Sequence, residues 1–275
     1  MRSPQAGCRF RICSGAMGNA VRYEARDRIG VITLDRPDNR NSMTPELLDA
    51  FAAASAQAAA DREIRVLVVT GTGSCFSSGA DFKATLQREG SMPPHARSYA
   101  MYEPFLSLLD LAVPVIGALN GHTVGGGFGL ALVCDVRVGA EDAKYGANFV
   151  KLGLAPGMAI SYLLPRLIGL ARASELLFTG RLVDGREAAA IGILNRAVPN
   201  ARVMDEAREM AAQIAGAAPI AVRATKAAMR RGLEMQVREA AYAEAYAQAE
   251  TIATEDAKEG IAALLAKRTP EFKGR

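Results

Sequence analysis

The stretch Asn120–Asp135 reads NGHTVGGGFGLALVCD, in which three consecutive glycines stand between a strand-like segment and an apolar run. Glycine in the first turn of a helix costs stability relative to alanine, so three glycines at a helix start need a reason. No aspartate, glutamate, lysine or arginine occurs in this stretch before Asp135. The pattern indicates a strand, a tight glycine turn and a buried helix that begins with bare backbone.

The composition is that of a globular protein. The chain has 275 residues, of which 50% are hydrophobic and 23% are charged, enough for one large domain with a buried core. Its net charge of +4 is too small to indicate nucleic-acid binding, and there is no tryptophan to stack on bases. No uncharged apolar run approaches the ~20 residues of a membrane span. We therefore expect a soluble protein with neither a nucleic-acid partner nor a membrane span.

The cysteines indicate the compartment. The chain contains Cys8, Cys13, Cys75 and Cys134, with no CxxC pair and no histidine at ligand spacing. This pattern predicts neither a disulfide framework nor a metal site, and it favours a reducing cytoplasm. Residues 1–20 carry arginines but no apolar core of a secretory signal, so we interpret them as a disordered arm outside the fold, with Met17 as an alternative start.

Hydrophobic periodicity predicts an α/β fold. Four segments are typical of strands: Ile29–Pro37, Ile64–Gly73, Pro114–Asn120 and Cys134–Ala140. The segment Met43–Ala60 is typical of a helix, with Thr44 as N-cap and Pro45 at the first helical position. Strands that alternate with helices favour crossover connections, and after about Leu163 the pattern becomes almost wholly helical. We predict an α/β core over residues 21–200 and an all-helical part over residues 201–275.

Common catalytic motifs are absent from the chain. Neither glycine-rich turn matches a dinucleotide fingerprint, and there is no phosphate-binding GK[ST] loop and no GxSxG nucleophile elbow. His95 and His122 are the only histidines, which leaves little room for a Ser–His or Cys–His machine. We expect both histidines to be surface or structural residues.

The two glycine-rich turns, Gly71–Asp81 and Asn120–Gly129, each follow a predicted strand. Such turns expose backbone, and a helix start adds N–H groups that have no acceptor within the helix. One N–H group from each turn, aimed at one point, would form an oxyanion hole. The turns could equally be tight packing corners, and the residues alone leave both interpretations open.

Several ordered motifs resemble one family. They are FSSGADFK, NGHTVGGGFGLALVCDVRV, KLGLAPG, LLPRLIG and ELLFTGRLVDGREAAAIGILNRAVP, and with LDRPDNRNSM and the closing KRTPEFKGR they extend from about Val21 to Arg275. The chain resembles the enoyl-CoA hydratase/isomerase family of the crotonase superfamily. The resemblance implies a crotonase-like core of stacked ββα turns and a C-terminal helical region that forms a homotrimer or a homohexamer. It also implies an acyl-CoA thioester as substrate, with no separate cofactor and no metal.

The resemblance assigns the two N–H groups to Ala80 in SGAD and to Gly126, the middle glycine of GGG. Loss of one such donor typically lowers a rate by ~10²–10³. Lys83, Phe272 and Lys273 would contact the nucleotide end of CoA. In full, the implied substrate-binding residues are Ala80, Asp81, Phe82, Lys83, Gly125, Gly126, Phe149, Gly157, Phe272 and Lys273.

The acids of the family are missing from their usual positions. Hydratases of this family carry one glutamate two residues after the GGG motif, where this chain has Gly129, and a second where it has Phe149. Hydration needs both acids, because one activates water and the other delivers the α-proton. Some relatives place an aspartate at the position of Gly157 instead, and the glycine–glycine–threonine that usually follows is replaced here by Met158–Ser161. The resemblance therefore implies an apolar pocket.

Three hypotheses follow. The main one is an enzyme, a lyase or isomerase that is not an efficient hydratase, because the oxyanion glycines are intact. Its acid or base would come from another position, the candidates being His122, Asn148, Glu103 and Asp81; Glu103 and His95 lie in a segment that often builds the substrate pocket. The alternative is a non-catalytic acyl-CoA-binding paralogue that delivers or senses a ligand. The third is a slow or vestigial hydratase.

Overall fold

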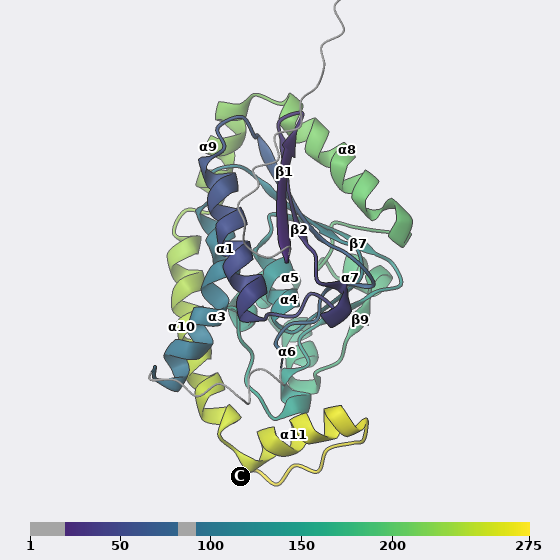
Figure 1. Cartoon of the computed structure of the whole chain (residues 1–275). Coiled ribbons are helices and arrows are strands. Elements are labelled where there is room, and N and C mark those ends of the chain that lie inside the picture. Colours follow the sequence, from purple (N-terminus) through teal and green to yellow (C-terminus); the bar gives the residue numbers. More distant parts are fainter. Residues whose placement is uncertain (1–19, 82–91) are drawn as a thin grey trace, which may run out of the picture.

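The computed structural model describes residues 20–81 and 92–275, and its centre is a six-stranded sheet with the order β1-β2-β3-β5-β7-β10 (Figure 1). β1 pairs antiparallel with β2, whereas the remaining neighbours pair parallel. The strands are β1 (Val21–Arg26), β2 (Ile29–Leu34), β3 (Val66–Gly71), β5 (Val115–Leu119), β7 (Val136–Ala140) and β10 (Arg196–Val198). Of the predicted arm, only Ala20 is described, and its carbonyl accepts the Asp35 N–H.

Helices cover both faces of this sheet. α1 (Pro45–Ala60) packs on β1 and β2, and α8 (Val203–Gly216) packs on β3, β5 and β7 from the opposite side (Figure 1). This double cover explains why every residue of β5 is buried, as the continuous apolar pattern predicted. α1 begins where the sequence predicted, since the Thr44 hydroxyl accepts the Leu47 N–H at 3.2 Å and Pro45 is the first helical residue.

A second sheet of very short strands lies beside the first, with the order β4-β6-β8-β9. Its members are β4 (Cys75–Ser77), β6 (His122–Val124), β8 (Lys144–Gly146) and β9 (Val183–Asp184). β4, β6 and β8 run parallel, and each is followed by a segment that carries a predicted site residue. The small sheet thus brings the two glycine-rich turns next to each other.

The remaining helices close the molecule. Those of the first part are α3 (Pro94–Leu106), α4 (Gly126–Val133), α5 (Ile160–Ile168), α6 (Leu170–Thr179) and α7 (Gly185–Ala190). The last part contains α9 (Pro219–Met229), α10 (Leu233–Ile252) and α11 (Glu255–Ala266). α10 lies along α3, and α11 crosses the lower end of the molecule (Figure 1). The chain after Leu163 is almost wholly helical, as expected, with two short exceptions in β9 and β10, of which β10 extends the main sheet.

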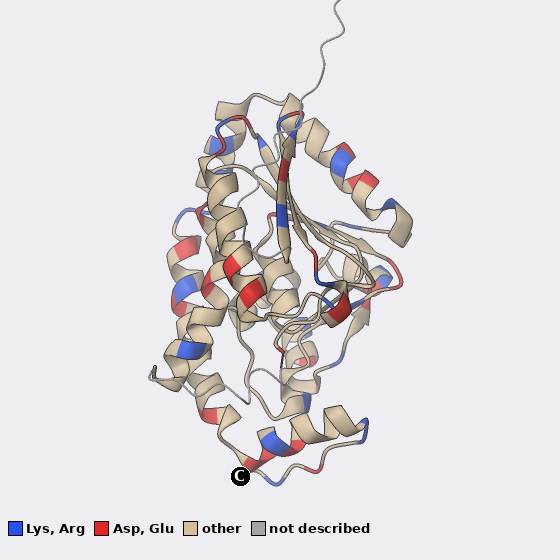
Figure 2. Ribbon diagram, viewed as in Figure 1, with Lys and Arg blue, Asp and Glu red and all other residues tan. Residues whose placement is uncertain are grey.

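An ion network ties the helical part to the sheet. Asp135, directly before β7, contacts Lys226 Nζ at 3.0 Å and Arg230 Nε at 2.7 Å, and it accepts the Val115 N–H at 2.7 Å. Burial lowers the pKa of Lys226, whereas the charge of Asp135 opposes this shift. Figure 2 shows that basic residues (blue) and acidic residues (red) are mixed along the outer helices and do not gather by sign. Among the described residues, no helix is long and apolar enough to cross a membrane.

Candidate active site

The two glycine-rich turns meet backbone to backbone. A Cβ atom placed on Gly79 would lie 2.7 Å from the Gly126 nitrogen and 2.9 Å from the Val124 oxygen, closer than real Cβ contacts. Gly79 also has a φ of +80°, which glycine adopts without strain. Ala80 follows it directly, and Gly126 is the first residue of α4, so its N–H has no acceptor within the helix. The fold thus brings Ala80 and Gly126 to the same place.

Close packing and backbone conformation together account for the three glycines. Gly125 has a φ of +59°. A Cβ at Gly126 would lie 2.2 Å from the Met43 sulfur, and one at Gly127 would lie 2.3 Å from the Ser77 oxygen. Contacts exclude a side chain at Gly126 and Gly127, whereas Gly125 is favoured by its positive φ, since its Cβ would lie 3.8 Å or more from its neighbours. The packing interpretation holds for Gly126 and Gly127, and it is compatible with an oxyanion hole because the same contacts leave the start of α4 bare.

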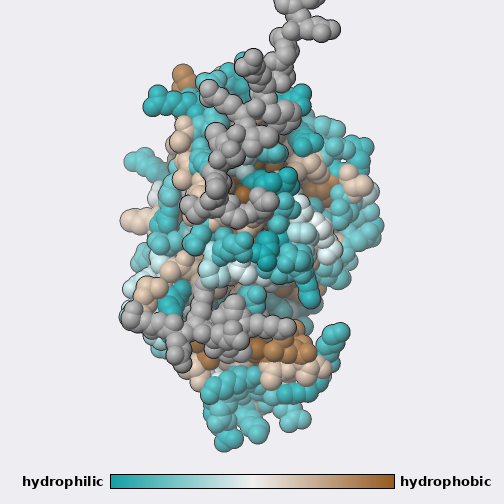
Figure 3. Space-filling view, viewed as in Figure 1, coloured by the Kyte–Doolittle hydropathy of each residue, from teal (hydrophilic) through white to brown (hydrophobic). Residues whose placement is uncertain are grey.

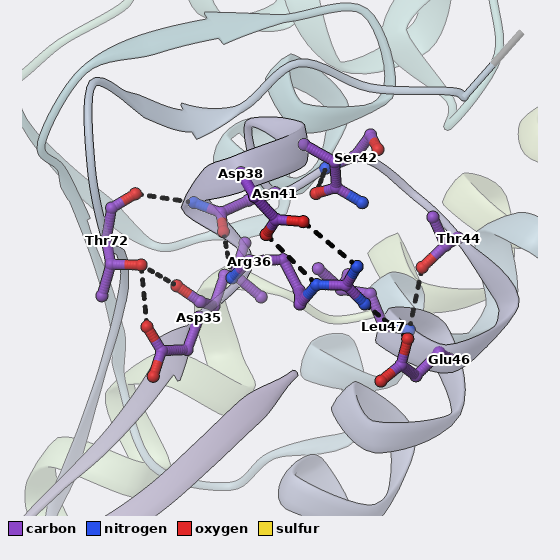
Figure 4. A network of polar contacts seen from close by, with 11 residues as sticks. Asp35, Arg36, Asp38, Asn41, Ser42, Thr44, Glu46, Leu47 and Thr72 are labelled. Carbon is purple, nitrogen blue, oxygen red and sulfur yellow. Dashed lines mark hydrogen bonds and ion pairs between the residues drawn. The ribbon is translucent and has the colours of Figure 1, made fainter. Parts of the chain in front are cut away.

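The loop between β2 and α1 fixes the first turn. The buried Asn41 donates from Nδ2 to the carbonyls of Thr72 and Cys75 at 3.0 and 2.9 Å, and its Oδ1 accepts the Arg36 N–H (Figure 4). The Met43 N–H then donates to the Gly79 oxygen at 2.8 Å. A buried, fully bonded amide holds its surroundings rigid. Through Asn41 and Met43, this loop holds the strand β4 and the residues before Ala80.

A cavity of about 540 Å³ opens at these turns. Four of the predicted substrate-binding residues line it: Ala80, Gly125, Gly126 and Phe149. Its other lining residues are Arg40, Ser74, Cys75, Ser78, His122, Val124, Lys144, Asn148, Leu152, Leu182 and Leu264. Arg40 and Lys144 are cations, and no aspartate or glutamate lines the cavity within the described parts of the chain. A cavity with this charge favours an anionic ligand.

Phe149 places an aromatic ring beside the second turn. Its Cζ atom lies 3.8 Å from the position of a Cβ on Gly125, and the residue is buried. The short helix η3 (Phe149–Leu152) that carries it packs under α11, where a Cβ on Gly260 would lie 2.5 Å from the Leu152 carbonyl carbon. Leu264 of α11 lines the cavity, although the sequence analysis did not predict it. In the space-filling view, hydrophobic residues are exposed just above α11 (Figure 3).

The candidate acids and bases divide into those at the cavity and those away from it. His122 and Asn148 line the cavity. His122 Nδ1 accepts the Lys144 N–H at 3.0 Å, which assigns the ring proton of the neutral imidazole to Nε2, so that nitrogen can donate but not accept. Neither Glu103, exposed on α3, nor Asp81 is among the lining residues, and His95 stacks on Tyr246 of α10 with ring centroids 3.9 Å apart.

Gly129 lies one turn after Gly126 on α4 and is buried against Met158. A Cβ on Gly129 would lie 2.3 Å from Met158 Cβ. Gly157 is equally confined, because its Cβ would lie 2.4 Å from the Tyr102 hydroxyl oxygen. Neither Gly129 nor Gly157 lines the cavity. At Gly129 and Gly157, two of the positions where the resemblance implied an acid, neighbouring side chains therefore fill the space.

The predicted contacts at the nucleotide end are not brought to the cavity. Phe272 and Lys273 lie in the segment after α11, where the Lys273 N–H donates to Asp256 at 2.6 Å and Phe272 is exposed, and neither lines the cavity. Phe82 and Lys83 lie outside the described residues. Within the described residues, no group of three or more His, Cys, Asp or Glu could hold a metal ion.

Comparisons with known proteins identify the class of protein to which this fold and this cavity belong. The profile of the enoyl-CoA hydratase/isomerase family matches residues 24–275. The chain is 35% identical over 255 residues to the probable enoyl-CoA hydratase echA8 of Mycobacterium bovis, covering 93% of this chain and 98% of that protein. The chain belongs to the enoyl-CoA hydratase/isomerase family.

Solved structures support the same assignment. The carnitinyl-CoA hydratase of Mycobacterium avium superposes with a TM-score of 0.83 at 31% identity, covering 94% of this chain and all of that one. An enoyl-CoA hydratase/isomerase of Pseudoalteromonas atlantica gives a TM-score of 0.83 at 28% identity, covering 93% and 100%. The predicted fold class and family are confirmed.

Proposed function

We propose that this protein binds an acyl-CoA thioester in the cavity at Ala80 and Gly126 and stabilises its enolate through the two backbone N–H groups. Donors aimed at the oxygen interact more strongly with an enolate than with a neutral carbonyl, and this difference raises the acidity of the α-carbon. Arg40 and Lys144 give the cavity the positive charge that an anionic CoA group prefers. The thioester is the substrate, and no further cofactor or metal is required.

We further propose that the protein is not an efficient hydratase. The observation that carries this proposal is the Phe149 ring, 3.8 Å from the Cβ position of Gly125, where the family's hydratases carry an acid. A phenyl ring neither accepts nor delivers a proton, and Gly129 offers no side chain. The remaining chemistry is that of a lyase or isomerase that acts through the enolate, and the α-proton would pass to a base other than the described lining residues, for which Asp81 and Glu103 stay the carboxylate candidates. The second candidate is a non-catalytic paralogue, favoured by the lack of a described carboxylate among the lining residues.

A substrate panel separates the two candidates. The protein is incubated with saturated, enoyl and aromatic acyl-CoA thioesters, products are read by mass spectrometry, and binding is measured by calorimetry. Turnover of any thioester supports the enzyme, and saturable binding without turnover supports the paralogue. No binding of any thioester at millimolar concentration would contradict both.

The oxyanion assignment needs a variant that removes only the N–H group. Gly126→Pro does so at the first helical position, where proline is tolerated, but its added atoms would meet the Met43 sulfur. We therefore compare Gly126→Pro with Gly126→Ala, both in a Met43→Ala background, since alanine adds the same Cβ and keeps the N–H. We expect turnover to be ~10²-fold lower with proline. Equal rates in two folded variants would contradict the assignment.

Assembly and location complete the proposal. The α8–α11 region would pack between subunits in a homotrimer or homohexamer, as sequence resemblance implied. The cysteine pattern favours the cytoplasm.

A further inference from the structure

Met158 occupies space that a side chain at residue 129 would need. The Cβ position of Gly129 lies 2.3 Å from Met158 Cβ and 3.0 Å from its Cγ, with Ile160 Cγ1 at 3.5 Å. Contacts below 3.0 Å are essentially never seen for a real Cβ, so no side chain fits at residue 129 while Met158 stays. Gly129 lies three residues after Gly126 and therefore on the same face of α4. Met158 therefore packs against α4 one turn after Gly126, the proposed oxyanion donor.

The backbone around Met158 is strained in a way that needs support. Met158 has a φ of +66° and Ala159 a φ of +56°, the left-handed region that residues with a Cβ rarely adopt. Such strain persists only where the surroundings determine the conformation, and it occurs often at functional sites. Met158 is 1% exposed and Ala159 is fully buried, so packing encloses the turn.

Two contacts hold the turn from outside. On α10, Glu244 Oε1 accepts the Ser161 N–H at 2.7 Å and the Ser161 hydroxyl at 2.5 Å. On the other side, the Tyr102 hydroxyl abuts Gly157 and donates to Gln248 at 2.5 Å. The helices α3 and α10 thus clamp the segment 157–161 and keep Met158 against α4.

We propose that Met158 limits which reactions this active site permits, because it fills the space that a side chain at residue 129 would need, the position at which the family resemblance implies a water-activating carboxylate. This inference rests on the proposed function, since it presupposes an acyl thioester at Gly126. It adds that two changes go together at this site. Residue 129 has no side chain, and Met158 of another segment fills the space that such a side chain would occupy. Under this proposal, the site still permits reactions in which the enolate reacts without addition of water.

A matched pair tests the inference. Met158→Glu places a carboxylate in this space with little change of size, and Met158→Gln is its neutral counterpart. We expect Met158→Glu to hydrate crotonyl-CoA ~10-fold or more faster than Met158→Gln, since one acid–base group typically contributes 10²–10⁴ and Phe149 remains. Both variants are checked by circular dichroism and by calorimetry with butyryl-CoA. Folded variants that bind butyryl-CoA and hydrate at equal rates would overturn the inference.

A double-mutant cycle measured by melting temperature tests the inference if these variants do not fold. Gly129→Ala is made with Met158 and with Met158→Gly, and the melting temperatures are compared. We expect a loss of about 5–10 °C beside methionine and little loss beside glycine. Equal losses would show that Met158 does not fill the space and would overturn the inference. Absence of butyryl-CoA binding to the unaltered protein would instead contradict the proposed function, so the two failures are distinguishable.

Discussion

At the scale of single residues, Glu244 is a carboxyl group that the fold buries at a cost. It is 6% exposed, and its Oε2 atom is buried with no hydrogen-bond partner among the described residues. Burial raises the pKa of Glu244, while its bonds with Ser161 and the nearby N–H groups of Ala159 and Ile160 oppose the shift. The neighbouring Tyr102 also has a raised pKa, because of burial and then the charge of Glu244.

This shift predicts a pH dependence of stability. Between the unfolded pKa of 4.5 and the higher folded value, the native state binds more protons than the unfolded state, so the stability contributed here falls as pH rises. Glu244→Gln keeps an acceptor for Ser161 and removes the charge. We expect the variant to gain stability relative to the unaltered protein as pH increases from 4.5 to 8, measured by urea unfolding. A constant difference across this range would contradict the assignment.

Residues of the site differ in whether the sequence alone could predict them. Ala80 and Gly126 stand within local motifs, so a resemblance over a few residues was enough to propose them as site residues, and the structure brings them together. Met158 and Glu244 act through contacts with residues distant in the chain, and Leu264 reaches the cavity only because α11 packs on η3. A local pattern carries no signal for such contacts. Phe272 and Lys273 stay a prediction as nucleotide contacts.

At the scale of elements, the attachment of α9 to the sheet depends on Asp135. Its carboxylate contacts Lys226 and Arg230 and caps the start of β5 through Val115, while Lys226 Nζ also donates to the Val113 carbonyl at 2.7 Å. Removing one partner of a buried pair leaves an uncompensated charge, which is costly. The side chains of all three charged residues are less than one fifth exposed.

We therefore predict that Asp135→Ala lowers the free energy of unfolding by about 3–5 kcal/mol. The matched control is Asp142→Ala, because Asp142 is 81% exposed and pairs only loosely with Arg186 at 3.4 Å. The control should change stability by about 0.5 kcal/mol or less. Chemical denaturation measures both variants, and similar values would contradict the structural role of Asp135.

The elements themselves were predictable in proportion to their length. The continuous apolar run of the six-residue strand β3 and the sixteen-residue pattern of α1 are long enough to be recognised, and Thr44 and Pro45 mark the start of α1. β4, β6, β8 and β9 have two or three residues each, too few for a period. Their pairing is set by the glycine-rich turns and the larger sheet. The small sheet that positions the site was therefore missed.

At the scale of the whole molecule, apolar surface is exposed along the helices. The most exposed large side chains include Leu170, Phe178, Ile220, Met229 and Met235, each more than 70% exposed. An apolar cavity of about 620 Å³ between α5 and α9 adjoins Met229 and Leu167. Contiguous apolar surface often marks protein–protein interfaces, and this cavity with Met229 at its edge is a candidate for one.

We predict a homotrimer or homohexamer in solution. Burial of this surface between copies would remove it from water and stabilise the assembly. Light scattering at micromolar concentration measures the mass, and Met229→Glu should lower it. A monomeric unaltered protein would contradict the prediction.

We propose that this member of the family holds an acyl thioester at two backbone donors without the acids that hydration needs. The most direct measurement is hydration of crotonyl-CoA by the unaltered protein, with calorimetric binding of butyryl-CoA measured on the same sample. We predict saturable binding together with hydration at or near background, because each missing acid–base group typically contributes 10²–10⁴. Brisk hydration, comparable to that of an ordinary hydratase, would contradict it.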